Sequence, residues 1–404
     1  MKILNRLKAA TAIMVRGDAL REPLGFSPKL TSEGGERVGE EAVLGLSAVW
    51  GCVNLLAGTI ASLPLMIYED NNGQREVAKE HPLYRILHDS PNFDQTSLDF
   101  WEFISASLEL WGNGYAEIVR SGAGITGLSP INPDTMKVKR LENGSLEYKW
   151  KQGRIARTEI DVNILHIRGF GGAPLGGMST LHFARNAFGS ARAVESSAAH
   201  TFKNGMRPSG ALTFENFLSE ENRKIAEDKL TEKFVGAMNS GRPMILEGGT
   251  KWDQLSINPE DAQMLESRKF SVEEICRFFG IPPHMVGHTG NSTSWGKGLE
   301  QQTLGFQKFT LRRRLKRIEQ ALEQQLLTPA DRAAGITIEF NLDGLLRGDS
   351  KGRSEFYKSG LNNGWLTINE VRVRENLPPV EGGDIPRMQI QNVPITDAGS
   401  DNDD

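Results

Sequence analysis

The chain has 404 residues and a formal net charge of −4, from 47 basic and 51 acidic side chains. This length allows two or three domains with a sizeable core, and 38% apolar residues are typical of a globular protein rather than a disordered or collagen-like one. Cys52 and Cys276 are too few for a disulfide framework, so a reducing compartment is the simpler expectation. The slightly acidic total argues against a protein that simply coats nucleic acid.

One stretch is long enough to span a bilayer, because no charged residue occurs from Val43 to Tyr68. It contains several polar residues and four glycine or proline breaks, however, and acidic rather than basic residues flank it. The pattern therefore favours a buried small-residue helix over residues 47–61, which Pro64 ends before a strand. Residues 1–16 are basic, and Lys8 interrupts their apolar run, so no export signal is expected.

The first half of the chain predicts a mixed α+β domain over residues 42–177. Apolar residues at helical spacing predict a helix over 94–111, ended by Gly112-Asn113-Gly114 and followed by a strand. The Asn143-Gly144 dipeptide between two alternating segments is the signature of a hairpin. Another short strand, ILHIRGF, follows before the glycine-rich segment 171–177.

Two long helices dominate the middle of the chain. We predict them over residues 178–204, capped by Ser179 or Thr180, and 259–279, with Pro259 at the first helical position. Between them lies a small β-α-β-β insert, which they would carry at the end of a two-helix stalk. A third helix is expected over 299–327, then the strand ITIEF, helices over 350–360 and 367–375, and a loose acidic tail.

The sequence offers no convincing catalytic, metal or nucleotide site. The glycines at 122, 124 and 127 match a dinucleotide motif, but two prolines follow where a helix should open. The segment 171–177 lacks the Gly-Lys-Ser/Thr ending of a phosphate-binding loop and is interpreted as a hinge. His284 and His288 lack the intervening glutamate of a helical zinc site. We therefore expect neither an enzyme nor a cofactor.

A basic cluster is the strongest local signal. Residues 297–317 carry seven basic side chains against the single acid Glu300, a net charge of +6 in a protein of net −4. A solvated helix face is the ordinary explanation, but so large a local excess favours phosphate as a partner. The basic residues are Lys297, Lys308, Arg312, Arg313, Arg314, Lys316 and Arg317.

Several segments, in order, resemble the portal protein family of tailed bacteriophages, of the type found in long-tailed, siphovirus-like phages. The resemblance covers residues 40–390, and the blocks at 259–287 and around NEVR are its most specific parts. The matching segments are VWGCVNLLAGTIASLPLMIY, WGNGYAEI, LSPINPDTMKV, GMSTLHFAR, PEDAQMLESRKFSVEEICRFFGIPPHMVG, LEQQTLGFQKFTLRRRLKRIEQAL and LLRGDSKGRSEFYKSGLNNGWLTINEVRVRENLPP.

The resemblance implies an α+β portal architecture and a ring, usually of twelve subunits, at one capsid vertex, through which DNA is packaged and ejected. Its implied parts are an N-terminal arm (1–41), a wing (42–177 and 297–350), stem helices (178–205 and 258–281), a clip (206–257), a tunnel loop (282–296), a helical crown (351–385) and an acidic tail (386–404). Arg313 stands where the family tends to have proline, which predicts a straighter tunnel helix.

Partners and site residues follow from the resemblance together with the basic cluster. The expected partners are further copies of the chain, the terminase large subunit, head-completion or adaptor proteins, capsid and scaffold proteins, and double-stranded DNA held through its backbone, with no membrane. The expected location is the virion, and the host cytoplasm during assembly. Candidate DNA-channel residues are Thr289, Gly290, Asn291, Ser292, Lys297, Lys308, Arg312, Arg313, Arg314, Arg268 and Lys269; candidate clip residues are Phe214, Glu215, Ile245, Leu246, Glu247 and Trp252.

Two other classes of function stay open at this point. A nucleic-acid-processing enzyme or motor subunit would need a metal or nucleotide site. A membrane-anchored oligomer would need residues 43–67 to span a bilayer.

Overall fold

The chain folds into two compact units, seen in a computed structural model. The larger unit combines residues up to Ser62 with Met66–Glu339, and the smaller combines Leu63–Leu65 with the chain from Phe340 onward. The structure describes residues 31–71, 74–203, 210–213, 220, 251–254, 259–288, 297–342, 350–375 and 377–387.

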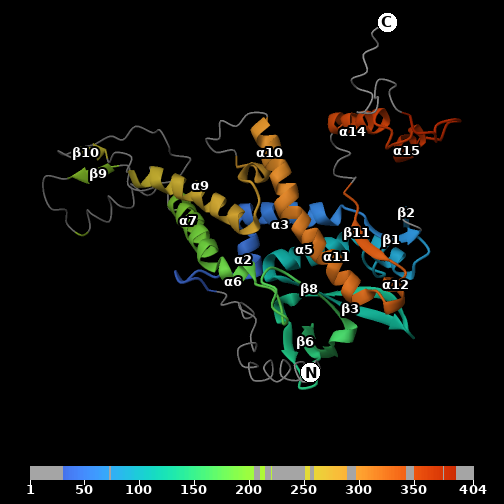
Figure 1. Cartoon of the computed structure of the whole chain (residues 1–404). Helices are drawn as coiled ribbons and strands as arrows, with labels where there is room; N and C mark the ends of the chain where they lie inside the picture. Colours follow the sequence, from blue (N-terminus) through green and yellow to red (C-terminus); the bar gives the residue numbers. More distant parts are fainter. Residues whose placement is uncertain are drawn as a thin grey trace, which may run out of the picture. The chain divides into compact units, whose positions relative to one another are not determined.

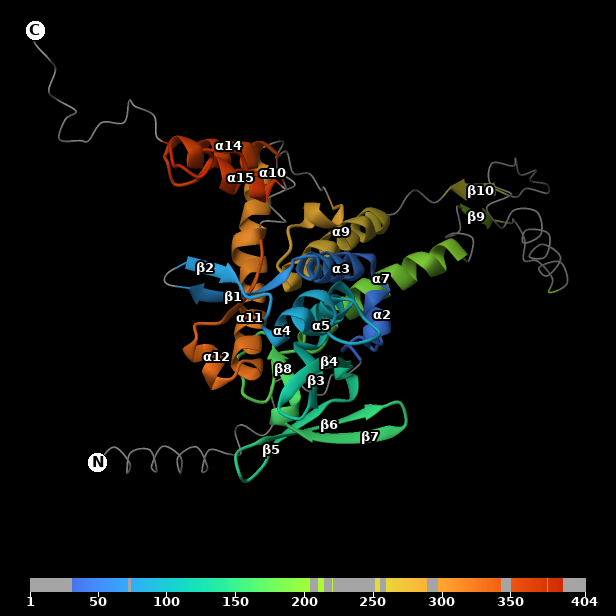
Figure 2. The same cartoon turned by 90° about the vertical axis from the view of Figure 1, so that its right-hand side faces the viewer.

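Two helices packed against each other form the centre of the larger unit (Figure 2). Helix α3 (Ser47–Ala61) coincides with its prediction, and most of its apolar side chains are buried, with Trp50 as an exposed exception, which explains the long uncharged stretch. Helix α5 (Ser97–Trp111) begins later than predicted, because Thr96 and Asp99 form a reciprocal capping box. Among the described residues, no helix is long and apolar enough to cross a membrane.

Three antiparallel sheets complete the core of the described chain. Strands β3 (Asn113–Ser121), β4 (Gly124–Ile131) and β8 (Ile164–Arg168) form the sheet β4-β3-β8. Strands β5 (Lys137–Arg140), β6 (Leu146–Gln152) and β7 (Ile155–Ile160) form β5-β6-β7 and include the predicted Asn143-Gly144 hairpin. Strands β1 (Leu65–Asn71), β2 (Gln74–Val77) and β11 (Thr337–Phe340) form β11-β1-β2. In Figure 2 the β4-β3-β8 sheet lies between α5 and the β5-β6-β7 sheet.

Two helices lead away from this core and back to it (Figure 1). The predicted helix 178–204 is divided at Ala184 into α6 (Thr180–Phe183), capped by Ser179 as predicted, and α7 (Arg185–Lys203). Helix α9 (Pro259–Phe279) packs against α7 and confirms the second prediction. Among the side chains that the structure describes, the buried apolar ones lie in the inner part of each helix: Phe188 and Ala191 on α7, and Ile275, Cys276 and Phe279 on α9. Residues 266–270 of α9 are exposed.

The insert between these helices is described only at its two ends. Strands β9 (Gly210–Thr213) and β10 (Lys251–Gln254) pair antiparallel, with Trp252 opposite Leu212, as expected for the first and last strands of the insert. Its predicted helix and its remaining strand lie outside the described residues, apart from Glu220.

The third long helix differs from a plain α-helix. It runs through α10 (Lys297–Gly305), a π-helical segment η6 (Phe306–Leu311) and α11 (Arg312–Leu326). The sequence predicted one continuous helix but not its π-helical turn. In such a turn the backbone hydrogen bonds join residues five apart instead of four, so the side chains are displaced from the positions of an α-helix. Within this turn, the Thr310 hydroxyl donates a hydrogen bond to the Gly280 carbonyl oxygen at 2.8 Å, which ties η6 to the end of α9.

The smaller unit contains two of the predicted helices. They are α14 (Ser350–Asn362) and α15 (Ile368–Arg374), and Thr367 caps α15 through a capping box with Glu370. Buried Asn369 holds the following segment: its amide nitrogen donates to Val380 O at 3.0 Å and its side-chain oxygen accepts from Val380 N at 2.8 Å.

A buried polar network links the sheets and α11 around His166. The oxygen of the Asn113 side chain accepts from Gly177 N at 2.8 Å and lies 2.9 Å from His166 Nε2, so His166 carries its proton on Nε2. Its Nδ1 then accepts from the Tyr148 hydroxyl at 3.1 Å. Gln325 bridges from α11 by accepting from His166 N and donating to His166 O. Burial, with Arg168 nearby, holds the pKa of His166 well below 6.5.

This network predicts a loss of stability on acidification. Below the unfolded-state pKa of about 6.5, His166 binds a proton in the unfolded chain but not in the folded chain, where it is buried. The free energy of unfolding therefore falls by up to about 1.4 kcal/mol per pH unit as the pH is lowered. Urea unfolding of the wild type between pH 7.5 and 5.5 should show this slope, and His166→Gln should lack it, whereas His88→Gln, at a partly exposed position, should keep it. Equal slopes for wild type and His166→Gln would contradict the assignment.

Candidate functional site

The basic cluster predicted at residues 297–317 meets the core where α5, α9 and α11 converge. Arg314 of α11 forms a bidentate ion pair with Glu109 of α5, with Nε–Oε1 at 2.5 Å and Nη2–Oε2 at 2.8 Å. Its Nη2 also donates to Phe279 O, the last residue of α9, at 2.9 Å. The two side chains are 15% and 9% exposed. Arg314 therefore holds three helices together.

This contact gives Arg314 a structural role that the prediction of a DNA-facing side chain did not include. Its charge is neutralised by a glutamate 205 residues away, which a count along one helix cannot include. Lys316 is likewise paired, at 2.8 Å with Glu319 and 3.5 Å with Glu339, and its hydrogen bond to Glu319 raises its pKa. The local charge of +6 therefore overstates the positive charge that is free to meet a partner.

The remaining basic residues of the cluster whose burial the structure describes fall into two groups. Lys308, Arg312 and Arg313 are exposed. Arg317 is half-buried, and desolvation, together with the charges of Arg313 and Arg314, lowers its pKa. Sequence reasoning grouped all of them because they share a helix, whereas the packing of α11 separates them.

The other predicted site residues are placed as follows. Arg268 and Lys269 are exposed on α9, Lys297 is the first residue of α10, and Trp252 lies in β10. Outside the described residues lie the tunnel-loop candidates Thr289, Gly290, Asn291 and Ser292 and the clip candidates Phe214, Glu215, Ile245, Leu246 and Glu247.

A cleft of about 500 Å³ opens beside the Arg314–Glu109 pair. Arginines from α9 and α11 and exposed phenylalanines share its wall, so it offers positive charge and apolar surface together. The lining residues that give this character are Arg277, Arg313, Arg317, Phe170, Phe183 and Phe278. Sequence reasoning missed the cleft, because it is assembled from five helices and a loop.

The side of the cleft that carries Ser179 is built by close backbone packing of glycines. Gly112 has φ +71°, and a Cβ there would overlap the carbonyl of Met178. A Cβ at Gly177 would overlap the Gly112 carbonyl oxygen, and Gly169 N donates to that same oxygen at 2.7 Å. Only glycine allows these approaches. The segment 171–177, interpreted from sequence as a hinge, is thus anchored at Gly177 before α6 begins.

Comparison with known proteins identifies the family. Residues 47–376 match the family model described as "Phage portal protein". The chain is 38% identical to the portal protein of Enterobacteria phage HK97 over 371 residues, covering 91% of this chain and 87% of that protein. It is 33% identical to the probable portal protein of Streptomyces phage phiC31, covering 86% and 78%.

Solved structures agree with this result. A chain in the neck of a native gene transfer agent (GTA) particle, computed with C12 symmetry, has a TM-score of 0.61 at 25% identity, covering 84% of this chain and 92% of that one. The fold and the sequence thus define a protein of the phage portal class. The chain belongs to the phage portal protein family, which confirms the resemblance and the α+β portal fold.

The buried ion pair gives a stability prediction. Arg314→Gln leaves the Glu109 carboxylate uncompensated in a nearly closed environment, and we expect a loss of about 3–5 kcal/mol in the free energy of unfolding. Arg312→Gln, at an exposed position of the same helix, should change stability by less than about 0.5 kcal/mol. Urea unfolding of both variants measures the difference. Equal stability of Arg314→Gln and Arg312→Gln would contradict the structural role of the pair.

Proposed function

We propose that this protein forms a ring of twelve subunits at one vertex of a phage capsid, that the ring is the channel for DNA packaging and ejection, and that it docks terminase and then head-completion proteins. One observation carries the proposal: the chain aligns over most of its length with a subunit of a particle neck computed with C12 symmetry. Membership of the portal family, matched over residues 47–376, supports it.

The projecting helices fit this proposal physically. Residues 266–270 of α9 are exposed in the single chain, and α7 is rich in alanine and serine, which allow close helix packing. In a ring, the same helices of neighbouring subunits can cover one another, and the insert between α7 and α9 would form the clip that meets terminase. Trp252 in β10 is the described member of that proposed docking surface.

The ring is tested directly on the purified full chain. We expect negative-stain images of rings with a central hole, and a native mass twelve times that of the 44.6 kDa chain. Rings made outside a capsid can deviate from twelve subunits, so an eleven- or thirteen-fold ring still supports ring formation. A monomer or dimer at all concentrations tested would contradict it.

The DNA channel is proposed to contact phosphate only, since DNA of any sequence must pass. With Arg314 paired to Glu109, the exposed cations Lys308, Arg312 and Arg313 are the candidates that the structure describes in the cluster, along with Arg268 and Lys269 on α9. In a ring, each of these charges recurs once per subunit. No observation favours the enzyme or the membrane-anchored alternative over this role.

A double variant tests the channel contacts. Lys308→Gln with Arg312→Gln should leave ring formation intact and reduce the length of DNA packaged, equally for DNA of different sequences, because backbone contacts are lost. The charge-retaining pair Lys308→Arg with Arg312→Lys is the matched control and should package normally. Unchanged packaging by normal rings of the glutamine variant would remove these residues from the channel.

A further inference from the structure

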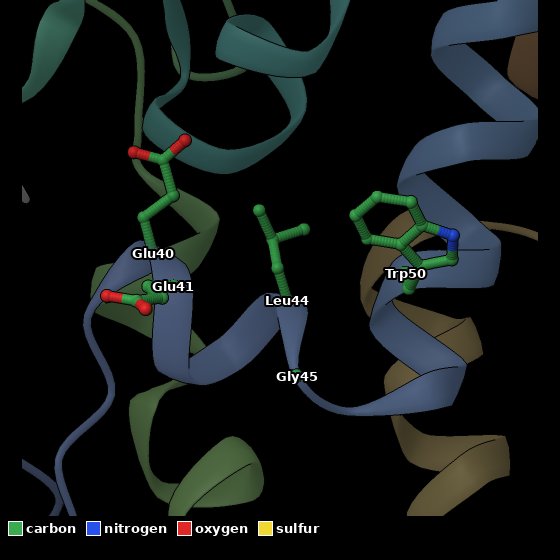
Figure 3. Close-up of a pocket in the computed structure, with 5 residues that line it drawn as sticks. All are labelled: Glu40, Glu41, Leu44, Gly45 and Trp50. Carbon is green, nitrogen blue, oxygen red and sulfur yellow. The ribbon is translucent and has the colours of Figure 1, made fainter.

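A second hollow, of opposite character to the arginine-lined cleft, lies at the start of α3. Figure 3 shows its lining: Glu40, Glu41 and Leu44 of helix α2 (Glu40–Leu44), with Gly45 and Trp50. Trp50 is 59% exposed, which is unusual for so large an apolar side chain. None of the described residues that line this hollow is basic. We call the side chains of Trp50, Glu40 and Glu41, which border this hollow, the acidic knob; Leu44 lies between the tryptophan and the glutamates in Figure 3.

The knob has spare hydrogen-bonding and charge capacity. Glu40 Oε2 accepts from Trp111 Nε1 at 3.2 Å, which fixes its position without neutralising it. Glu41 is exposed, and none of the described residues forms an ion pair with it. A surface that combines an exposed tryptophan with carboxylates fits a partner surface that is apolar and positively charged.

The arginine-lined cleft has that complementary chemistry. Arg313 is exposed and has no carboxylate partner among the residues that the structure describes, and Arg317 lies beside it. The one acid on the wall, Glu109, is already paired with Arg314. Phe170, Phe183 and Phe278 remain exposed around the cleft, with Phe170 at 67%. The volume of about 500 Å³ is that of a small-ligand pocket, which is sufficient for an indole ring and a neighbouring side chain.

The two surfaces lie at opposite ends of one helix. Trp50 is in the first turn of α3, and Ile60, which lines the cleft, is in its last turn. Ten residues of α-helix separate them by about 15 Å along its axis. One subunit therefore cannot fill its own cleft with its own knob.

A cyclic ring of more than two subunits requires two different, mutually complementary surfaces on every subunit. We propose that Trp50, Glu40 and Glu41 of one subunit seat in the Arg313–Arg317 cleft of the next subunit around the ring. The partner of the cleft is thus a second copy of this chain. The inference rests on the proposed ring and adds to it the surfaces through which neighbours join.

Charge reversal tests the pairing in the full chain. Glu41→Arg brings two positive charges together at Arg313, and Arg313→Glu brings two carboxylates together, so each single variant should need about tenfold or more higher protein concentration to form rings. The combination of both substitutions in one chain restores opposite charges and should restore ring formation. Glu142→Arg and Arg154→Glu, on exposed turns, change the net charge equally and should assemble normally.

Mixing the two single variants gives a sharper result. The altered knob of Glu41→Arg matches the altered cleft of Arg313→Glu, and the unaltered knob of the latter matches the unaltered cleft of the former. An equimolar mixture should therefore form rings in which the variants alternate, at concentrations where neither forms rings alone. Native mass spectrometry with one variant isotopically labelled should then show rings that contain equal numbers of the two variants, as alternation requires.

The outcomes separate this inference from the proposed function. Wild-type rings together with normal rings of both single variants would overturn the knob-and-cleft pairing and leave the ring intact. Defective single variants that neither the combined chain nor the mixture rescues would also overturn it. Normal rings of Arg313→Glu with shortened packaged DNA would assign the cleft to the DNA backbone instead. A wild type that forms no rings overturns both proposals.

Discussion

The ion pair between Arg314 and Glu109 is the contact on which the rest of the larger unit depends. It joins α11 to α5, and the hydrogen bond from Arg314 to Phe279 O adds the end of α9. A buried pair of this kind contributes less by its own attraction than by the cost of breaking it, because the partner left behind is a charge without water. The end of α9 is therefore fixed, and with it the direction in which α7 and α9 leave the core. The hydrogen bond from the Thr310 hydroxyl to the Gly280 carbonyl oxygen also holds this end of α9.

The distribution of free positive charge also depends on the Arg314–Glu109 ion pair. A net charge of −4 gives no indication of a nucleic-acid partner, and the +6 over residues 297–317 suggested one too strongly. Packing neutralises Arg314 and Lys316 and leaves Lys308, Arg312 and Arg313 exposed. A channel through which DNA slides needs few, non-specific phosphate contacts, since each additional cation strengthens binding and slows release. A small number of free cations per subunit, repeated around a ring, is consistent with that requirement.

Local signals allowed much of the fold to be predicted. Helix α3, the hairpin at Asn143-Gly144 and the ends of α9 were predicted because small residues, turn dipeptides and prolines act over a few positions. The break at Ala184, the π-helical turn and the cleft were not predicted, because they depend on contacts between distant segments. Gly112 illustrates the limit: the sequence marks it as a helix stop, and only the structure shows that Met178 packs on it. The family resemblance supplied the ring, which one chain cannot display.

The proposed interface between subunits and the Arg314–Glu109 ion pair are mechanically related. In the proposed ring, the knob and the cleft lie at the two ends of α3, so the angle between successive subunits depends on α3 and on the elements that form the cleft wall. Two of those elements, α9 and α11, are held to α5 by Arg314. A ring closes at a given subunit number only if this angle is kept, since an open angle gives a helix or an incomplete ring. The buried ion pair would then control not only the stability of one chain but also the number of chains that close the ring.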